Sequence, residues 1–378
     1  MTASDFQISE QMPCRLDRPA AGLRVAWIAA LLLLLAQAAF AQDARAPELP
    51  QPEQRPVLIS PTAIGDLEYR PGRGLRIGDT GLTIGGYTTL AVSRLEGEHW
   101  RIGLDDLDLF VFYDPTPYLH LFSDTGFQNI FDLDDTGGGG TSQAEASIER
   151  LYGDLNLSDR ANFRVGKFLT PVGRWNQVPA EPLVWTTSRP LVTSRPFDEH
   201  VAGAAFWGSA FPADGSLSYK VYGQFFDQLT SNTSISPSDE SVGARLDFSS
   251  LGGWSLGSSY FAFTRNGKWN QLGGVDGLWQ RDRWELSGEL LAGHGDPDGH
   301  RIFGVYLQGV VELLAGVHAI ARYEYYEPGA NHAAIDLYDA GLAWRPLSFL
   351  ILKADYLCAN RSSEFASPGL QGSFALLF

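Results

Sequence analysis

The sequence of 378 residues is short of the residue types on which several protein classes depend. It has two cysteines, too few for a disulfide scaffold or a cysteine-rich metal site. Charged residues make up 19% of the chain, below the ~25% of an ordinary soluble domain. Basic residues are the scarcer sign, since 28 Lys and Arg against 44 Asp and Glu give a formal net charge of −16. This balance argues against nucleic-acid binding through a basic face.

Long apolar runs are also missing, with one exception near the N-terminus. Residues 25–40 read VAWIAALLLLLAQAAF, follow three arginines and end in the small-x-small pattern Ala39-Phe40-Ala41. The run is shorter than the ~20 residues of a membrane-anchoring helix and a cleavage pattern follows it, so we expect residues 1–41 to be a secretory signal peptide. Residues 42–80 are rich in proline and charge, and we expect a mostly extended periplasmic segment there.

From residue 81 onward the chain offers glycine, aromatic residues and an alternating pattern. In residues 317–325, valine, alanine and tyrosine occupy every second position, and His318, Arg322 and Glu324 lie between them. Residues 242–248, 284–292, 336–345 and 348–356 alternate in the same way. A period of two is typical of strands with one apolar and one polar face. Such strands build membrane β-barrels, and also soluble sandwiches whose apolar faces point inward.

Three features favour the membrane barrel. Aromatic residues lie near expected strand ends, as in the girdles at membrane–water interfaces: Trp100, Tyr113, Trp207, Trp254, Trp284, Trp344 and Tyr356. Short connections alternate with longer ones along the candidate strands. The last strand ends on Phe378, which resembles the C-terminal strand of bacterial outer-membrane proteins, where the terminal aromatic is an assembly signal.

The predicted fold is therefore all-β, a closed antiparallel transmembrane β-barrel of about sixteen strands over residues 81–378. Sixteen strands leave an aqueous lumen, and the even number places both chain ends in the periplasm of a Gram-negative bacterium, with the barrel in the outer membrane. The candidate strands begin near residues 82, 100, 117, 146, 161, 201, 216, 241, 253, 271, 283, 301, 316, 333, 348 and 369.

The longest connection follows the fifth candidate strand, which ends in Arg164-Val165-Gly166-Lys167-Phe168 and leads into Thr170-Pro171-Val172-Gly173. This segment resembles the G-K-F-x-T-P-F-G turn of the phosphate-selective porin O/P-like family of outer-membrane proteins. Phe378 and the strand plan agree with that family, whereas its N-terminal coiled coil and Lys-rich loop are absent. The resemblance implies a third external loop folded into the lumen, a preference for anions such as phosphate, and a homotrimer. It also implies contact with outer-membrane lipid and insertion by the barrel-assembly machinery through Phe378.

The third loop is locally basic in an acidic protein. Between residues 169 and 197 its ionisable residues are Arg174, Glu181, Arg189 and Arg195. Guanidinium groups bind phosphate or carboxylate through paired hydrogen bonds, so unpaired arginines here would form a cationic pore constriction. Five prolines in the loop favour a rigid segment that packs on the barrel wall.

Charged residues of both signs are expected along the pore wall. The basic candidates are Arg164, Lys220, Arg245 and Arg322, and the acidic candidates are Asp106, Asp108, Asp154, Glu289, Glu324 and Asp339. Unpaired basic residues would extend a cationic path along the lumen. Arginines paired with the carboxylates would instead give a polar and largely neutral wall, and the sequence leaves both arrangements open.

No pattern in the chain identifies an enzyme. The histidines are scattered, and no Gly-x-Ser-x-Gly, Walker-type or dinucleotide pattern occurs. Residues 294–300 and 132–135 contain metal-ligand residue types, but both segments are more typical of turns. We therefore expect no catalytic residue, no metal and no cofactor. The sequence predicts a passive porin for small hydrophilic solutes or ions. The alternatives are a lipase- or protease-like barrel enzyme and a non-conducting structural or adhesion barrel.

Overall fold

The computed structural model describes residues 62–140, 144–226, 238–265, 267–294, 301–329, 332–360 and 366–378. The predicted signal peptide and the first twenty residues of segment 42–80 lie outside these described residues. Within the described ranges the helices are single turns, and none has the length and apolar character needed to cross a membrane.

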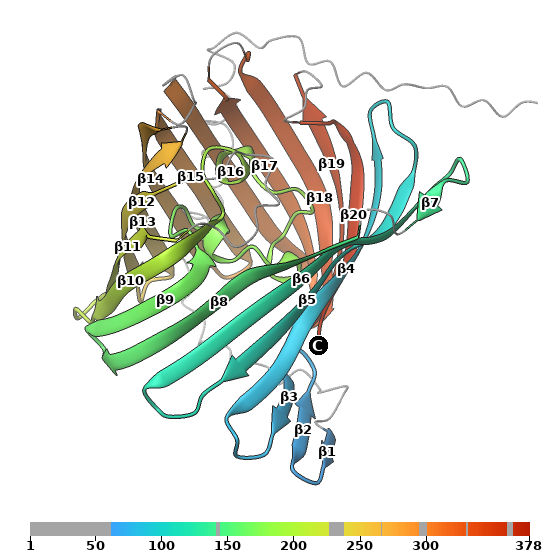
Figure 1. The fold of residues 1–378 in the computed structure, drawn as a ribbon. Coiled ribbons are helices and arrows are strands. Elements are labelled where there is room, and N and C mark those ends of the chain that lie inside the picture. Colours follow the sequence, from blue (N-terminus) through green and yellow to red (C-terminus); the bar gives the residue numbers. More distant parts are fainter. Residues whose placement is uncertain are drawn as a thin grey trace, which may run out of the picture.

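Sixteen of the described strands form one closed barrel (Figure 1). Its strands are β4 (Leu82–Leu95), β5 (Arg101–Tyr113), β6 (Leu119–Asp134), β8 (Glu145–Ser158), β9 (Ala161–Leu169), β10 (His200–Ala210), β11 (Gly215–Gln224), β12 (Ser241–Ser250), β13 (Trp254–Arg265), β14 (Lys268–Arg281), β15 (Trp284–His294), β16 (Arg301–Leu314), β17 (Val317–Glu327), β18 (Ile335–Leu347), β19 (Leu350–Ala359) and β20 (Gly369–Leu377). Each pairs antiparallel with the next, and β20 pairs with β4. The sixteen-stranded antiparallel barrel predicted from the alternating pattern is confirmed. The largest error in a strand start is at β14, predicted near residue 271 and beginning at Lys268.

The barrel turns its apolar face outward and its charged face inward. On the outer face, Leu246 and Leu342 are 54% and 53% exposed. On the inner face, the arginines Arg245 and Arg322 are only 3% exposed. A soluble sandwich would bury the leucines and expose the charges. An apolar exterior around a charged interior is instead the arrangement of a barrel whose outer solvent is lipid.

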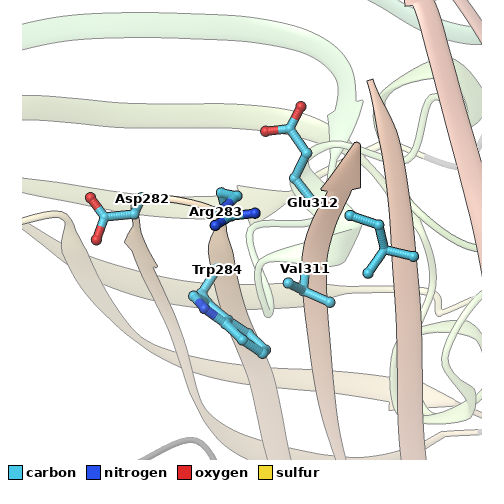
Figure 2. Close-up of a pocket in the computed structure, with 6 residues that line it drawn as sticks. Asp282, Arg283, Trp284, Val311 and Glu312 are labelled. Carbon is cyan, nitrogen blue, oxygen red and sulfur yellow. The ribbon is translucent and has the colours of Figure 1, made fainter. Parts of the chain in front are cut away.

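One end of the barrel carries the short turns, of two to five residues, and the opposite end carries the long third loop. Aromatic side chains mark the rim at the short-turn end. Trp284 follows the turn 282–283 and is the register partner of Val311 on β16, and Figure 2 shows the two side chains side by side. The backbone N–H of Glu312 donates to the carbonyl of Arg283 at 2.9 Å and ties the turn to the next strand. Rings between an apolar band and polar turns are typical of a membrane–water interface.

The C-terminal residue completes the seam between β20 and β4. The N–H of Phe378 donates to the carbonyl of Gly86 at 2.9 Å, and the N–H of Gly86 donates back at 3.0 Å. A β-carbon at residue 86 would lie 2.0 Å from the carbonyl oxygen of Asp108 and 2.9 Å from the Phe378 ring. Glycine at this position therefore lets the terminal ring lie against β4.

Residues 62–77 differ from the extended segment that the sequence predicts. They form a meander of three short strands, β1 (Thr62–Ile64), β2 (Leu67–Arg70) and β3 (Gly74–Ile77), at the same end of the barrel as the C-terminus (Figure 1). The reason is that β4 reaches beyond β20. β20 pairs with β4 only from Tyr87 onward, and β3 pairs with the edge that this leaves, residues 82–84. Covering an open strand edge satisfies backbone groups that would otherwise lack partners.

The assignment of the faces predicts a depth-dependent response to charge. Leu342→Arg places a cation on the outer face near the middle of β18, where it should cost about 2–4 kcal/mol of folding free energy. Leu314→Arg is the matched control, because Leu314 ends β16 at the short-turn rim and the penalty there should be about 0–1 kcal/mol. Urea titration of refolding into lipid vesicles measures both values. Equal costs at the two positions would contradict the assignment.

Candidate functional site in the barrel lumen

The third loop, residues 170–199, leaves β9 and enters the barrel interior, where Figure 1 shows it in green. It contains the single turns η1 (Trp175–Gln177), η2 (Glu181–Leu183) and α2 (Leu191–Ser194). Its hydrogen bonds reach β15, β17, β18, β19 and β20, across the lumen from β9. The predicted folding of this loop into the lumen is confirmed.

The first anchor of the loop is the carboxylate of Glu289 on β15. Its Oε1 accepts the backbone N–H groups of Arg174 and Trp175 at 3.0 and 2.6 Å, and the hydroxyl of Tyr306 at 3.0 Å. The preceding Gly173 has φ +65°, and a β-carbon there would lie 2.0 Å from the other oxygen of Glu289. The final glycine of the Thr170–Gly173 turn is therefore required by the approach of the wall carboxylate.

Three further contacts hold the loop to the same wall. The backbone N–H of Leu191 donates to Glu324 at 2.7 Å. Thr187 donates its backbone N–H and its hydroxyl to the two oxygens of Asp355, at 3.0 and 2.5 Å. Glu181 pairs with Lys353 at 2.6 Å. The wall thus satisfies the polar groups of the loop, as buried polar groups require.

Arg322 lies beneath the loop at the centre of a buried charge cluster. It pairs with Glu324 at 2.8 Å and with Asp339 at 3.0 Å, and it donates to the carbonyl of Ser188 at 3.0 Å and to the hydroxyls of Thr186 and Ser188. Removal of one partner from such a buried cluster leaves an uncompensated charge, which is strongly destabilising. The cluster therefore fixes the middle of the loop.

Two of the other basic wall candidates, Arg164 and Arg245, form ion pairs with wall carboxylates. Arg164 pairs with Asp154 at 2.7 Å, and Arg245 pairs with Asp276 at 2.7 Å and with Asp247. Lys220 lies beside this second group as the register partner of Arg245.

The acidic residues of β5 have different surroundings. Asp108 accepts a hydrogen bond from Tyr87, and Asp106 lies within electrostatic range of Glu181. Within the described ranges, no basic side chain is within 4.0 Å of either carboxylate. When both carboxyl groups are ionised, they give this part of the wall a negative charge.

The three loop arginines have different surroundings from one another. Arg189 pairs with Glu199 at 2.9 Å and donates to Asn176. Arg195 interacts electrostatically with Tyr326 on β17. Arg174 donates to the hydroxyl of Ser255 at 3.4 Å, and no carboxylate of the described part of the chain lies within ion-pair distance of it. The loop therefore does not present three equivalent cations to the lumen, because Arg189 is neutralised within the loop itself.

The two loop carboxylates respond differently to their surroundings. Burial raises the pKa of Glu181, although Lys353 lies beside it. Burial also opposes ionisation of Glu199, but the charges of Arg189 and His200 outweigh it and lower the pKa of Glu199. The Arg189–Glu199 pair therefore stabilises the loop above the ordinary glutamate pKa of ~4.3 and is lost as the pH falls through the lowered value.

Sequence reasoning missed several residues that hold the loop, chiefly Lys353, Asp355 and Arg345. The alternating pattern places Lys353 and Asp355 on the polar face of their strand, but nothing in it indicates that they meet a loop more than 160 residues earlier. No metal-holding group of three or more His, Cys, Asp or Glu occurs in the described ranges. Residues 295–300 of the histidine-containing turn lie outside those ranges.

Known proteins resemble this chain in fold more than in sequence. No family model matches the chain. An uncharacterised protein of Aquifex aeolicus is 23% identical over 337 residues, covering 73% of this chain and 75% of that protein.

Three solved structures are similar in fold, and each match covers 99% of the solved chain. OmpF of Salmonella typhi in complex with daunomycin has a TM-score of 0.59 at 10% identity over 80% of this chain. The anion-selective porin from Comamonas acidovorans has a TM-score of 0.54 at 12% identity over 79%. The trimer form of the outer membrane protein OmpT of Vibrio cholerae has a TM-score of 0.55 at 11% identity over 79%. The chain therefore shares the barrel fold of outer-membrane porins.

The Glu289 anchor predicts that Gly173→Ala loosens the third loop. The new β-carbon would collide with Glu289 and occupy a left-handed backbone conformation, at a cost of about 1–3 kcal/mol. Gly309→Ala on β16 is the control, because a β-carbon there meets nothing within 4 Å. Limited proteolysis of the folded barrel should cut the loop of Gly173→Ala faster than that of the control. Identical cleavage rates would contradict the anchoring role.

Proposed function

We propose that this chain is an outer-membrane porin, a passive diffusion channel for small hydrophilic solutes. The observation that carries the proposal is a sixteen-stranded barrel with a charged interior, narrowed by a loop that is tied to one side of the wall. A barrel of this strand number encloses an aqueous lumen unless a plug fills it. Selection in such a channel comes from the width of its narrowest part and from the charges that line it.

The position of the loop supports a passage along the opposite wall. The anchors at Glu289, Glu324 and Asp355 draw the loop toward β15, β17 and β19. We place the passage between the loop and strands β5–β9, whose inner positions carry Asp106 and Asp108. Solutes wider than this gap would be excluded, and charged solutes would meet the field of the two carboxylates.

An anion or phosphate preference is the finer form of the proposal. It rests on the resemblance of the Gly166–Gly173 segment and on the basic character of the loop. Arg174 has no carboxylate partner in the described ranges and supports the preference, whereas the Arg189–Glu199 pair contributes little net charge. The carboxylates of Asp106 and Asp108 act in the opposite direction. We therefore propose a weakly selective channel in which Arg174 and the β5 carboxylates have opposing effects.

The membrane setting belongs to the same proposal. The apolar exterior suits outer-membrane lipid, and the seam contacts of Phe378 suit a C-terminal strand that the barrel-assembly machinery would recognise. The similarity to the trimer form of OmpT supports a homotrimer. A lipase- or protease-like barrel and a non-conducting structural barrel remain the alternative functions, and conductance separates both from a porin.

The experiment is planar-bilayer recording of refolded protein in a KCl gradient at pH 8. Stepwise conductance is the expected result, and its absence in correctly folded protein would overturn the proposal. In the same recordings, Arg174→Gln should shift the reversal potential toward cations, and Asp106→Asn with Asp108→Asn should shift it toward anions. The double variant Arg189→Gln/Glu199→Gln removes a neutral pair and serves as the control. A shift in the control as large as that of Arg174→Gln would contradict the assigned pairing.

A further inference from the structure

The third loop and strands β14, β15, β16 and β18 line a pocket of about 280 Å³ that the channel function does not explain. It lies toward the short-turn end of the barrel, because Gln280 and Arg345 come from the strand ends there. Its volume is close to the lower end of small-molecule binding sites, ~300–1,000 Å³. Its walls combine apolar rings, cations and hydrogen-bonding groups, as such sites do.

A buried amide in the pocket has an unused acceptor. Gln308 on β16 is 2% exposed and lines the pocket, and its Oε1 has no hydrogen-bond partner in the described part of the chain. Its register neighbour Arg322 is already bound to Glu324 and Asp339. A buried acceptor without a partner is unusual and costly, so this oxygen points to a donor supplied by a ligand.

Two guanidinium groups give the pocket a positive character. Among the described residues, the guanidinium of Arg174 has one hydrogen-bond partner, the hydroxyl of Ser255 at 3.4 Å. Arg345 donates to the carbonyl of Leu183 at 3.3 Å and lies over the ring of Trp185 at 4.1 Å. The one acidic residue of the lining, Glu285, lies within electrostatic range of Arg345 and accepts hydrogen bonds from the indole of Trp185 and the amide of Gln280. The two cations thus outnumber the single carboxylate.

Apolar rings from the loop cover the same space. Trp175 and Trp185 both line the pocket, and Trp175 packs edge-on against Tyr306 at 6.5 Å between ring centroids. The ring of Trp185 is already contacted by Arg345 and by His318, the latter at 4.6 Å between ring centroids. The flat indole of Trp175 therefore suits the C–H face of a ring-shaped ligand better. An inorganic anion would satisfy the arginines but would not cover the apolar face of Trp175.

We propose that this pocket, beside the passage at the short-turn end of the channel, binds a small hydroxylated carboxylate of the size of a monosaccharide acid. The carboxylate would bind Arg174 and Arg345, a hydroxyl would donate to the Oε1 of Gln308, and the ring would lie against Trp175. The inference rests on the proposed channel function and names a class of solute for it.

The test uses D-glucuronate as the probe and the intact refolded protein in detergent. Titration should quench tryptophan fluorescence to saturation, and glucose and inorganic phosphate should each bind at least tenfold more weakly. Gln308→Leu removes the acceptor at similar volume, and Arg345→Met removes a cation, so each should weaken glucuronate binding about tenfold, or ~1.4 kcal/mol. Lys220→Met is the matched control, because it removes a lumen cation that does not line the pocket.

Bilayer recording of the same preparations separates the two proposals and verifies that each variant folds into a pore. Saturable quenching that the two pocket variants weaken and Lys220→Met does not supports the pocket. Equal binding of glucose, or an equal loss in Lys220→Met, overturns the pocket and leaves the porin intact. Folded protein without conductance overturns the proposed function, whatever the fluorescence shows.

Discussion

The lumen of this barrel depends on hydrogen bonds from the third loop to carboxylates of the wall. Glu289, Glu324 and Asp355 each accept at least one backbone N–H of the loop, and these contacts recur along its length. A polar segment inside a barrel must find partners for its backbone, since an unsatisfied buried group costs about 1–3 kcal/mol. The position of the loop, the charges left in the lumen and the pocket all follow from this attachment.

The attachment also decides which charges remain available to a solute. Glu289 and Asp355 accept neutral donors of the loop, whereas Glu324 and Asp339 pair with Arg322 and Arg189 pairs with Glu199. Arg174 on the loop and Asp106 on β5 have no such partner within the described ranges. The field in the lumen therefore depends on which side chains are paired, and not on the net charge of −16 alone.

Much of the fold was predictable because strand alternation is a local signal. The exposure of Leu342 and the burial of Arg322 follow from their positions alone. The meander of residues 62–77 was not predictable, since it depends on β4 being longer than its partner β20. Residue types also indicated that the loop is basic, but the pair Glu181–Lys353 spans 172 positions and arises only when the barrel closes. For the same reason no sequence pattern indicated the pocket around Gln308.

The central claim, that the anchored loop sets the width of the pore, is tested most directly by polymer exclusion. Single-channel conductance is recorded in polyethylene glycols of increasing mass, for the native protein and for a variant in which a short glycine linker replaces residues 174–196. The account predicts that the native pore excludes polymers that enter the variant and that the variant conducts more. The same exclusion limit in both proteins would contradict it.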